Sequence, residues 1–121
     1  MGKYDLWLEE WKKGATLAND QEDLAIAEGV TRSYAKGGYR AAVSRDIELR
    51  KQTAQRRYMD LGFIAYDYAA LGDKDQTFAW LEKAYSEKAG SLGYIKVTTL
   101  MDSLRSDPRY IDLLKRMGLP Q

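Results

Sequence analysis

The densest group of side chains that could do chemistry is a run of cations between residues 45 and 57. Its members are Arg45, Arg50, Lys51, Arg56 and Arg57. A basic face of this kind could follow a phosphate backbone. Asp46 and Glu48 interrupt the run, however, and no aromatic side chains alternate with the cations to stack on bases. We therefore interpret it as a solvated helix end and keep nucleic-acid binding as a minor alternative.

Few side chains in this sequence are candidates for catalysis. The 121 residues include no histidine and no cysteine, which excludes imidazole acid-base catalysis, thiol nucleophiles, thiolate metal sites and disulfides. Ser44, Ser91 and Ser103 have no evident base to activate them. The adjacent carboxylates Glu9 and Glu10 lie in no apolar surroundings that would shift a pKa. The sequence predicts a protein that is not an enzyme, with no catalytic residue, cofactor or metal.

Two tryptophans give a further candidate site. Trp7 and Trp11 are four residues apart, so on a helix they share a face and could form a cage for a ligand. An apolar stripe at this spacing more often packs on a neighbouring helix. We favour the packing interpretation.

Composition limits the class of protein. Of the 121 residues 45% are hydrophobic, which is enough for one packed domain, and 19 cations against 18 carboxylates give a net charge of +1. Near-neutral charge removes whole-chain electrostatics as an argument for anionic partners. The longest apolar stretch is too short to span a bilayer, and the amino-terminal residues show no leader pattern, so we expect a cytoplasmic protein without a membrane partner.

The positions of these groups depend on helices, because apolar residues recur at three- and four-residue spacing and nowhere alternate as in a strand. Asp20 and Asp73 are expected to cap helix starts, and Gly38 and Gly72 to end helices. Asp107 followed by Pro108 marks a further start. The six predicted helices span about residues 4–17, 22–36, 39–53, 58–71, 74–87 and 108–117.

One phrase occurs twice. Tyr34-Ala35-Lys36-Gly37-Gly38 returns as Tyr68-Ala69-Ala70-Leu71-Gly72, an interval of 68 − 34 = 34 residues. This is the period of a two-helix repeat unit. Stacked units of this kind form a solenoid whose concave surface usually binds another chain. After Gly90 the rhythm is lost, which predicts an irregular bridge followed by a short capping helix.

The residues around Tyr68 resemble the tetratricopeptide repeat (TPR) family. Leu61, Ile64 and Ala65 stand at the family's Trp, Leu and Gly positions, and Thr77, Leu81 and Ala84 stand at the second-helix contacts. The unit that begins near Leu24 matches less closely, because Arg50 occupies a position that is usually small. Gln55 and Ala89 replace the closing prolines of the two units.

The resemblance implies an all-α fold, an α-α superhelix of TPR-like helical hairpins with a short carboxy-terminal capping helix. We expect a single domain over residues 1–121. Residues 1–20 would be a first helix, the second half of a truncated repeat. Repeats would follow at 22–55 and 58–89, and residues 90–121 would form the bridge and cap. The carboxy-terminal half is also similar to repeat regions attached to bacterial signalling proteins and transcription regulators.

The implied function is protein–protein interaction or scaffolding, with a peptide or partner protein bound in the concave groove. The alternative is a structural or regulatory segment of a larger bacterial signalling or transcription-regulating protein. Carrying the family's register onto this chain places the groove at Glu28, Arg32, Lys36, Met59, Phe63, Tyr66 and Ala70. Tyr66 and Met59 would be apolar anchors and Arg32 would pair with an acidic group, unless Tyr66 and Met59 are simply core.

The first helix carries one more expectation. A solenoid with a cut end exposes apolar surface, which predicts either a larger natural protein or a homo-oligomer. In this sequence the residues that would carry self-association are Tyr4, Trp7 and Trp11.

Overall fold

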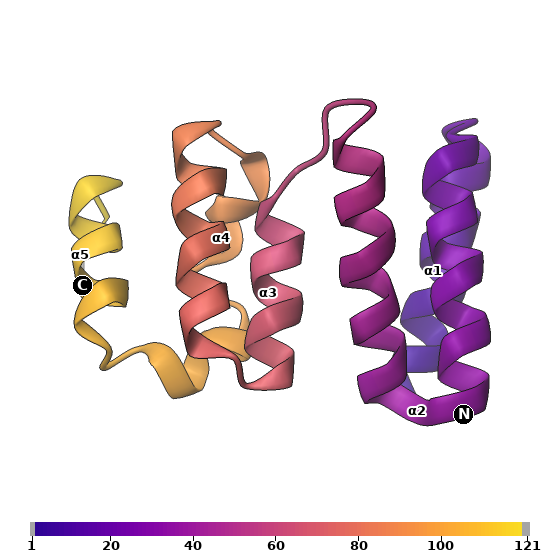
Figure 1. Ribbon diagram of the computed structural model, residues 1–121, viewed down its shortest axis with the longest axis horizontal. Coiled ribbons are helices and arrows are strands. Elements are labelled where there is room, and N and C mark those ends of the chain that lie inside the picture. The colour runs from indigo at the N-terminus through magenta and orange to yellow at the C-terminus, as the bar shows by residue number, and fades with distance from the viewer. Residues whose placement is uncertain (1, 120–121) are drawn as a thin grey trace. The chain divides into compact units, whose positions relative to one another are not determined.

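The computed structural model describes residues 2–119, and this part of the chain is helical throughout, without a strand. It divides into two compact units, Met1–Tyr58 and Met59–Gln121 (Figure 1). The boundary falls where the second predicted repeat begins. The fold is thus all-α, as predicted, and the six predicted helices correspond to six α-helical segments among the described residues.

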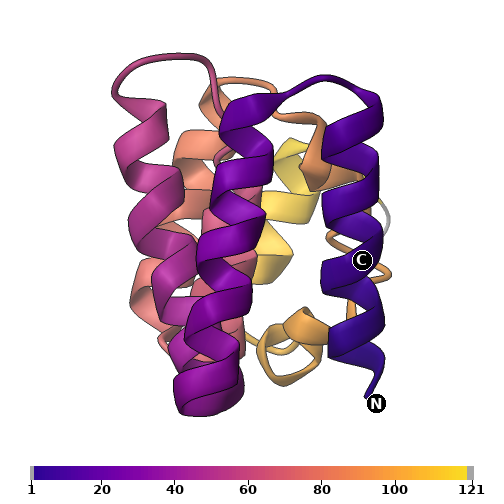
Figure 2. The same cartoon turned by 90° about the vertical axis from the view of Figure 1, so that its right-hand side faces the viewer.

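The first unit contains α1 (Lys3–Leu17) and α2 (Gln21–Ala54). Gly38 divides α2 into two arms, because its φ of +80° and ψ of −163° are not helical. Only glycine adopts this backbone region readily, which explains why the repeated phrase ends on it. Figure 2 shows α1 and the two arms side by side.

Short local signals set the ends of these helices. The Asp20 side chain accepts a hydrogen bond from the Asp23 N–H at 3.0 Å and caps α2. That bond, and after it the Arg57 guanidinium, hold the pKa of Asp20 below its ordinary value. The charged carboxylate also suits the positive end of the helix dipole.

Apolar residues of α1 and of both arms of α2 form the core of the first unit. The described residues bury Leu8, Ala15, Ile26, Ala27, Val30, Ala42, Val43 and Ile47. Tyr4 and Trp11 are half-buried. The prediction that Trp7 lies in the packed stripe is wrong in part, because 49% of this residue is exposed.

The second unit begins with α3 (Gly62–Leu71), four residues later than predicted. The delay has a cause in Asp60, whose carboxylate accepts hydrogen bonds from the Gly62 N–H and the Ser91 N–H, both at 2.9 Å. Residues around Asp60 are therefore committed to a contact with a segment 31 residues away. They do not form the first turn of a helix.

α3 and α4 (Lys74–Ser86) form a hairpin with a tight turn. Gly72 ends α3 in the left-handed conformation, at φ +82° and ψ 13°. Asp73 then accepts a hydrogen bond from the Gln76 N–H at 3.1 Å and starts α4. Both features were predicted from sequence. The hairpin buries Ile64, Ala65, Tyr66, Thr77, Phe78, Leu81 and Ala84.

The predicted bridge contains two short 3₁₀ helices, η1 (Gly90–Tyr94) and η2 (Thr99–Leu104), and leads into α5 (Pro108–Arg116). α5 buries Tyr110, Leu113 and Leu114. It also forms ion pairs with α4: Asp75 with Arg109 at 2.9 Å, and Glu82 with Arg116. The two pairs follow the same order along both helices, so α5 runs parallel to α4 (Figure 1).

These ion pairs repeat the interval found in the sequence. Asp75 with Arg109 and Glu82 with Arg116 are each 34 residues apart, and so are the capping residues Asp73 and Asp107. The 34-residue interval therefore continues into α5, beyond the point where the sequence phrase is lost. α5 follows α4 in the same direction and at the same interval.

None of the described helices is both long and apolar enough to cross a bilayer.

Candidate functional site

The predicted basic face is neutralised within its own unit. Four of its five cations form ion pairs with carboxylates, and the fifth, Lys51, also has an interaction partner. The pairs are Arg45 with Glu48, Arg50 with Asp46 at 2.8 Å, Arg56 with Glu22 at 3.5 Å, and Arg57 with Asp20 at 3.1 Å. Cations that are already paired have little charge left for a phosphate backbone. This geometry does not favour nucleic-acid binding.

Arg50 is a buried structural cation. Its side chain is 9% exposed, its Nε donates to Asp46 Oδ2, and its guanidinium carbon lies 5.0 Å from the centre of the Trp11 ring. A small residue at this position, as the TPR pattern expects, could make none of these contacts. Arg50, which departs from the pattern, therefore joins the second arm of α2 to α1 through its contact with Trp11.

The rings of the first helix contact residues of their own unit. Tyr4 lies 5.3 Å from Trp7, 4.9 Å from Tyr34 and 5.0 Å from Tyr39, between ring centres. Trp11 donates its indole N–H to Asp23 at 2.9 Å. Arg50 over its ring and the Trp7 ring at 5.2 Å thus occupy part of the surface of Trp11 that a ligand cage would use. Of the three residues expected to carry self-association, only Trp7 remains largely open.

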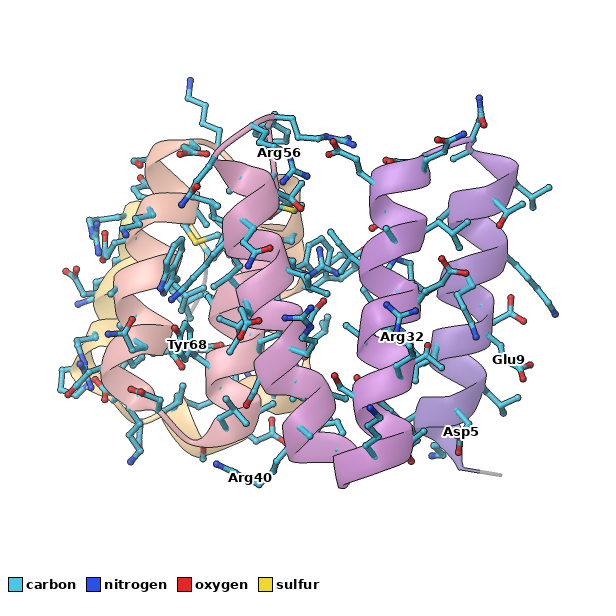
Figure 3. All side chains as sticks on the ribbon, turned by 45° about the vertical axis from the view of Figure 1, so that its right-hand side comes forward. Asp5, Glu9, Arg32, Arg40, Arg56 and Tyr68 are labelled. Carbon is cyan, nitrogen blue, oxygen red and sulfur yellow. The ribbon has the colours of Figure 1, made fainter. Side chains whose placement is uncertain are left out.

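Three predicted groove residues form one open stripe on the first arm of α2. Glu28, Arg32 and Lys36 follow one another at four-residue spacing and are all exposed. None of their side chains makes an ion pair or hydrogen bond within residues 2–119. The contrast with the paired cations of the second arm is clear. In Figure 3 the Arg32 side chain projects in front of the ribbon of its helix.

The other four predicted groove residues belong to the second unit and differ in exposure. Phe63 is exposed, while Met59 and Ala70 are half-buried. Tyr66 is only 5% exposed, and its hydroxyl donates to the Ser91 carbonyl at 2.7 Å. Burial, with the nearby Asp60 charge, raises the pKa of Tyr66 well above its ordinary value. The expectation that Tyr66 anchors a ligand is wrong, and its alternative, a core residue, is correct.

Ser91 binds the Asp60 carboxylate, and this contact has a structural role. Its backbone N–H and its hydroxyl both donate to Asp60, and the side chain is buried. A methyl group added at Gly62 would lie 1.9 Å from Ser91 Oγ, so the two backbones approach closely here. We call Asp60, Gly62, Tyr66 and Ser91 the bridge lock. It fixes η1 against α3 and leaves no space for a substrate beside the serine.

Arginines also tie α5 to the hairpin. Hydrogen bonding from Arg116 holds the pKa of Glu82 below its ordinary value of 4.5, despite some opposing desolvation. Arg116 also stacks on Tyr85, at 5.5 Å from the ring centre, and Arg109 stacks on Phe78 at 4.5 Å. Each arginine thus covers an aromatic side chain while pairing with an acid.

A pH dependence follows from the Glu82 pair. Because the folded pKa lies below the unfolded value, the carboxylate adds stability above the unfolded pKa and loses this as the pH falls through the folded one. We expect Glu82→Gln to lower the urea midpoint at pH 7, with a difference from wild type that shrinks steadily below pH 4.5. Glu87→Gln, at an exposed residue without an ion pair, is the matched control. If the urea midpoint of Glu82→Gln lies as far below that of wild type under pH 4.5 as it does at pH 7, the stabilising role of the Glu82 carboxylate is contradicted.

Neither a metal site nor a similar protein indicates the function. Among residues 2–119 no three acidic side chains group closely enough to hold a metal ion. The chain matches no protein-family model, no curated protein and no solved structure. The candidate site therefore depends on its own geometry, and the open stripe Glu28–Arg32–Lys36 is the part of the predicted groove that this geometry leaves available.

Sequence reasoning missed two contacts that shape this site. Asp46 lies four residues before Arg50, a spacing that signals a helical ion pair, but nothing in the sequence marks the pair as buried. The bridge lock joins residues 31 apart and has no local signal. The capping residues Asp73 and Asp107, 34 apart, could have shown that the repeat interval continues.

Proposed function

We propose that this chain is a tetratricopeptide-type interaction module of the cytoplasm, without catalytic activity, that binds a carboxylate-bearing peptide segment of a partner protein. The superhelix of the family and its concave groove are part of this proposal. Support for the family comes from the 34-residue interval, which relates Gly38 to Gly72 and the caps of α4 and α5. A positive-φ glycine ends a helical segment at both places.

One observation carries the binding proposal. Arg32 is exposed and makes no ion pair with any residue that the structure describes, whereas Arg45, Arg50, Arg56 and Arg57 of the same unit are all paired. A planar guanidinium presents a fork of donors that suits a carboxylate, and an unpaired one can bind without first breaking an internal bond.

The neighbours of Arg32 fit a segment laid along the helix. Ala25 and Ala35 are exposed on this arm and are small enough for another backbone to approach. Lys36, one turn after Arg32, adds a second cation, and Glu28, one turn before it, gives the stripe a direction by rejecting acidic groups at that end. The ligand that fits best has a carboxylate opposite Arg32 and a basic or neutral residue opposite Glu28.

The test is a charge reversal. Peptides selected by wild type from a displayed random library would be titrated calorimetrically against wild type and Arg32→Glu. We expect the variant to bind at least tenfold more weakly, about 1.4 kcal/mol, because a repulsion replaces an ion pair. Lys115→Glu makes the same charge change at an exposed residue of α5 and should leave the affinity within about twofold.

Two results would contradict the proposal. Selected peptides that bind Arg32→Glu as tightly as wild type would show that the stripe is not the site. A library that yields no binder at all would favour the alternative, a structural or regulatory segment whose partners are other domains.

A further inference from the structure

A second surface lies on the outer side of α1. Five residues recur there at alternating three- and four-residue spacing: Lys3, Leu6, Glu10, Lys13 and Leu17. All five are exposed, and Leu6 and Leu17 are 53% and 88% exposed. We call this set the outer stripe. On a helix it lies opposite Leu8 and Ala15, the two residues that α1 buries. The stripe therefore faces away from the core of its unit.

Its pattern is that of a coiled-coil seam. Residues three and four apart form the line along which one helix packs on another. The two leucines stand at the ends of the seam, with Glu10 and Lys13 between them. Among the described residues these two charges pair only with each other, at 3.7 Å, and their side chains are 73% and 68% exposed. A weak surface pair of this kind can exchange partners at little cost.

The outer stripe is complementary to the same stripe of a second copy that runs in the opposite direction. When two copies of α1 are placed antiparallel about a two-fold axis between residues 11 and 12, Leu6 of one copy faces Leu17 of the other. Glu10 then faces Lys13, and each contact occurs twice, as an isologous interface requires. A parallel pairing would instead place Glu10 against Glu10 and Lys13 against Lys13. Charge thus selects the antiparallel arrangement.

The surface shape agrees with this pairing. A shallow hollow of about 470 Å³ is lined by Lys12, Lys13, Thr16 and Leu17. Lys13, Thr16 and Leu17 have the spacing of a coiled-coil hole, and in the antiparallel arrangement Leu6 of the second copy is the side chain that enters it. Gly14 flanks the seam, and open space surrounds the position of its missing side chain.

We infer that the outer stripe of α1 is a docking surface for a second copy of this chain, bound antiparallel through Leu6, Glu10, Lys13 and Leu17. This differs from the self-association expected through Tyr4, Trp7 and Trp11, and it is independent of the Arg32 site. α1 is about 22 Å long, too short to bury the roughly 800 Å² per partner of a standard stable interface. The dimer is therefore weak and depends on protein concentration.

The experiment is a mixing test by sedimentation velocity over a concentration series. Glu10→Lys places lysine against lysine in a homodimer, and Lys13→Glu places glutamate against glutamate. A mixture of the two variants restores both pairs in the heterodimer. We expect each variant alone to dimerise at least tenfold more weakly than wild type. The equimolar mixture should dimerise as wild type does.

The controls separate this from a change inside the helix. Both single variants lose the internal pair of Glu10 with Lys13, yet only their mixture can regain association, so recovery on mixing identifies a contact between copies. Lys115→Glu controls for the change in net charge that Lys13→Glu makes. A wild type that remains monomeric at every concentration, single variants that dimerise like wild type, or a mixture that stays monomeric would each overturn the inference.

Discussion

Replacing Gly62 by alanine is expected to destabilise the second unit by about 3 kcal/mol, because the added methyl group has no space. It would lie 1.9 Å from Ser91 Oγ and 3.1 Å from both the Ser91 Cβ and Asp60 Oδ1. No rotation of Ser91 clears both of its atoms. Rotation of the Ser91 hydroxyl away from the methyl group loses its hydrogen bond to Asp60, and relief of the remaining contact with Cβ requires η1 to shift from α3, which strains the hydrogen bonds of Asp60 and Tyr66 to this segment. Urea unfolding followed by circular dichroism measures the loss.

Gly93→Ala is the matched control for this variant. Gly93 lies in the same 3₁₀ helix as Ser91, has no positive φ, and meets nothing within 4 Å at the position of an added methyl group. Its substitution should change the free energy of unfolding by no more than about 0.5 kcal/mol. A second check combines Gly62→Ala with Ser91→Gly, which should be about as stable as Ser91→Gly alone. Equal urea midpoints for the two alanine variants would show that the close approach is absent.

The second large effect is expected at Arg50. Arg50→Met keeps an unbranched apolar side chain but leaves Asp46 as a buried carboxylate without its cation, which costs about 3–5 kcal/mol. No other described residue replaces Arg50 as the partner of Asp46, since Asp46 Oδ1 is buried without a hydrogen-bond partner within residues 2–119 and Oδ2 accepts from Arg50. The variant also loses the stacking on Trp11. The measured quantity is the free energy of unfolding of the first unit, in urea.

Arg45→Met provides the comparison. Arg45 lies on the same arm of α2 and pairs with Glu48, but both side chains are exposed, so we expect a loss below about 1 kcal/mol. Asp46→Leu combined with Arg50→Met removes both buried charges and should recover most of the stability lost in the single variant. If the double variant is no more stable than Arg50→Met, the unpaired carboxylate is not the cause.

Local signals made the helix ends predictable. Asp20, Asp73 and Asp107 each accept a hydrogen bond from a backbone N–H two or three residues further on. The information for a cap is thus contained in a few consecutive residues. Gly38 and Gly72 ended their helices as predicted, because few other residues adopt positive φ. These signals fixed the order and approximate bounds of the helices.

Contacts between distant residues were not predictable in the same way. The start of α3 was placed too early because Asp60 is held by Ser91. Tyr66 has the spacing of a groove residue, and only the position of η1 shows that it is buried. The exposed position of Arg32 on its arm agrees with the sequence pattern, but only the positions of the neighbouring carboxylates show that Arg32 has no ion-pair partner within residues 2–119.

The aromatic contacts of the two units have a practical consequence. Trp7 and Trp11 belong to the first unit, and Trp80 to the second, where the Lys83 amine lies 4.1 Å from its ring centre. Each unit thus carries its own natural fluorophore. Because an indole emits differently in water than under a covering cation or ring, variants that keep one fluorophore would report when each half melts. Whether both halves melt as one cooperative block can then be determined without attaching a dye.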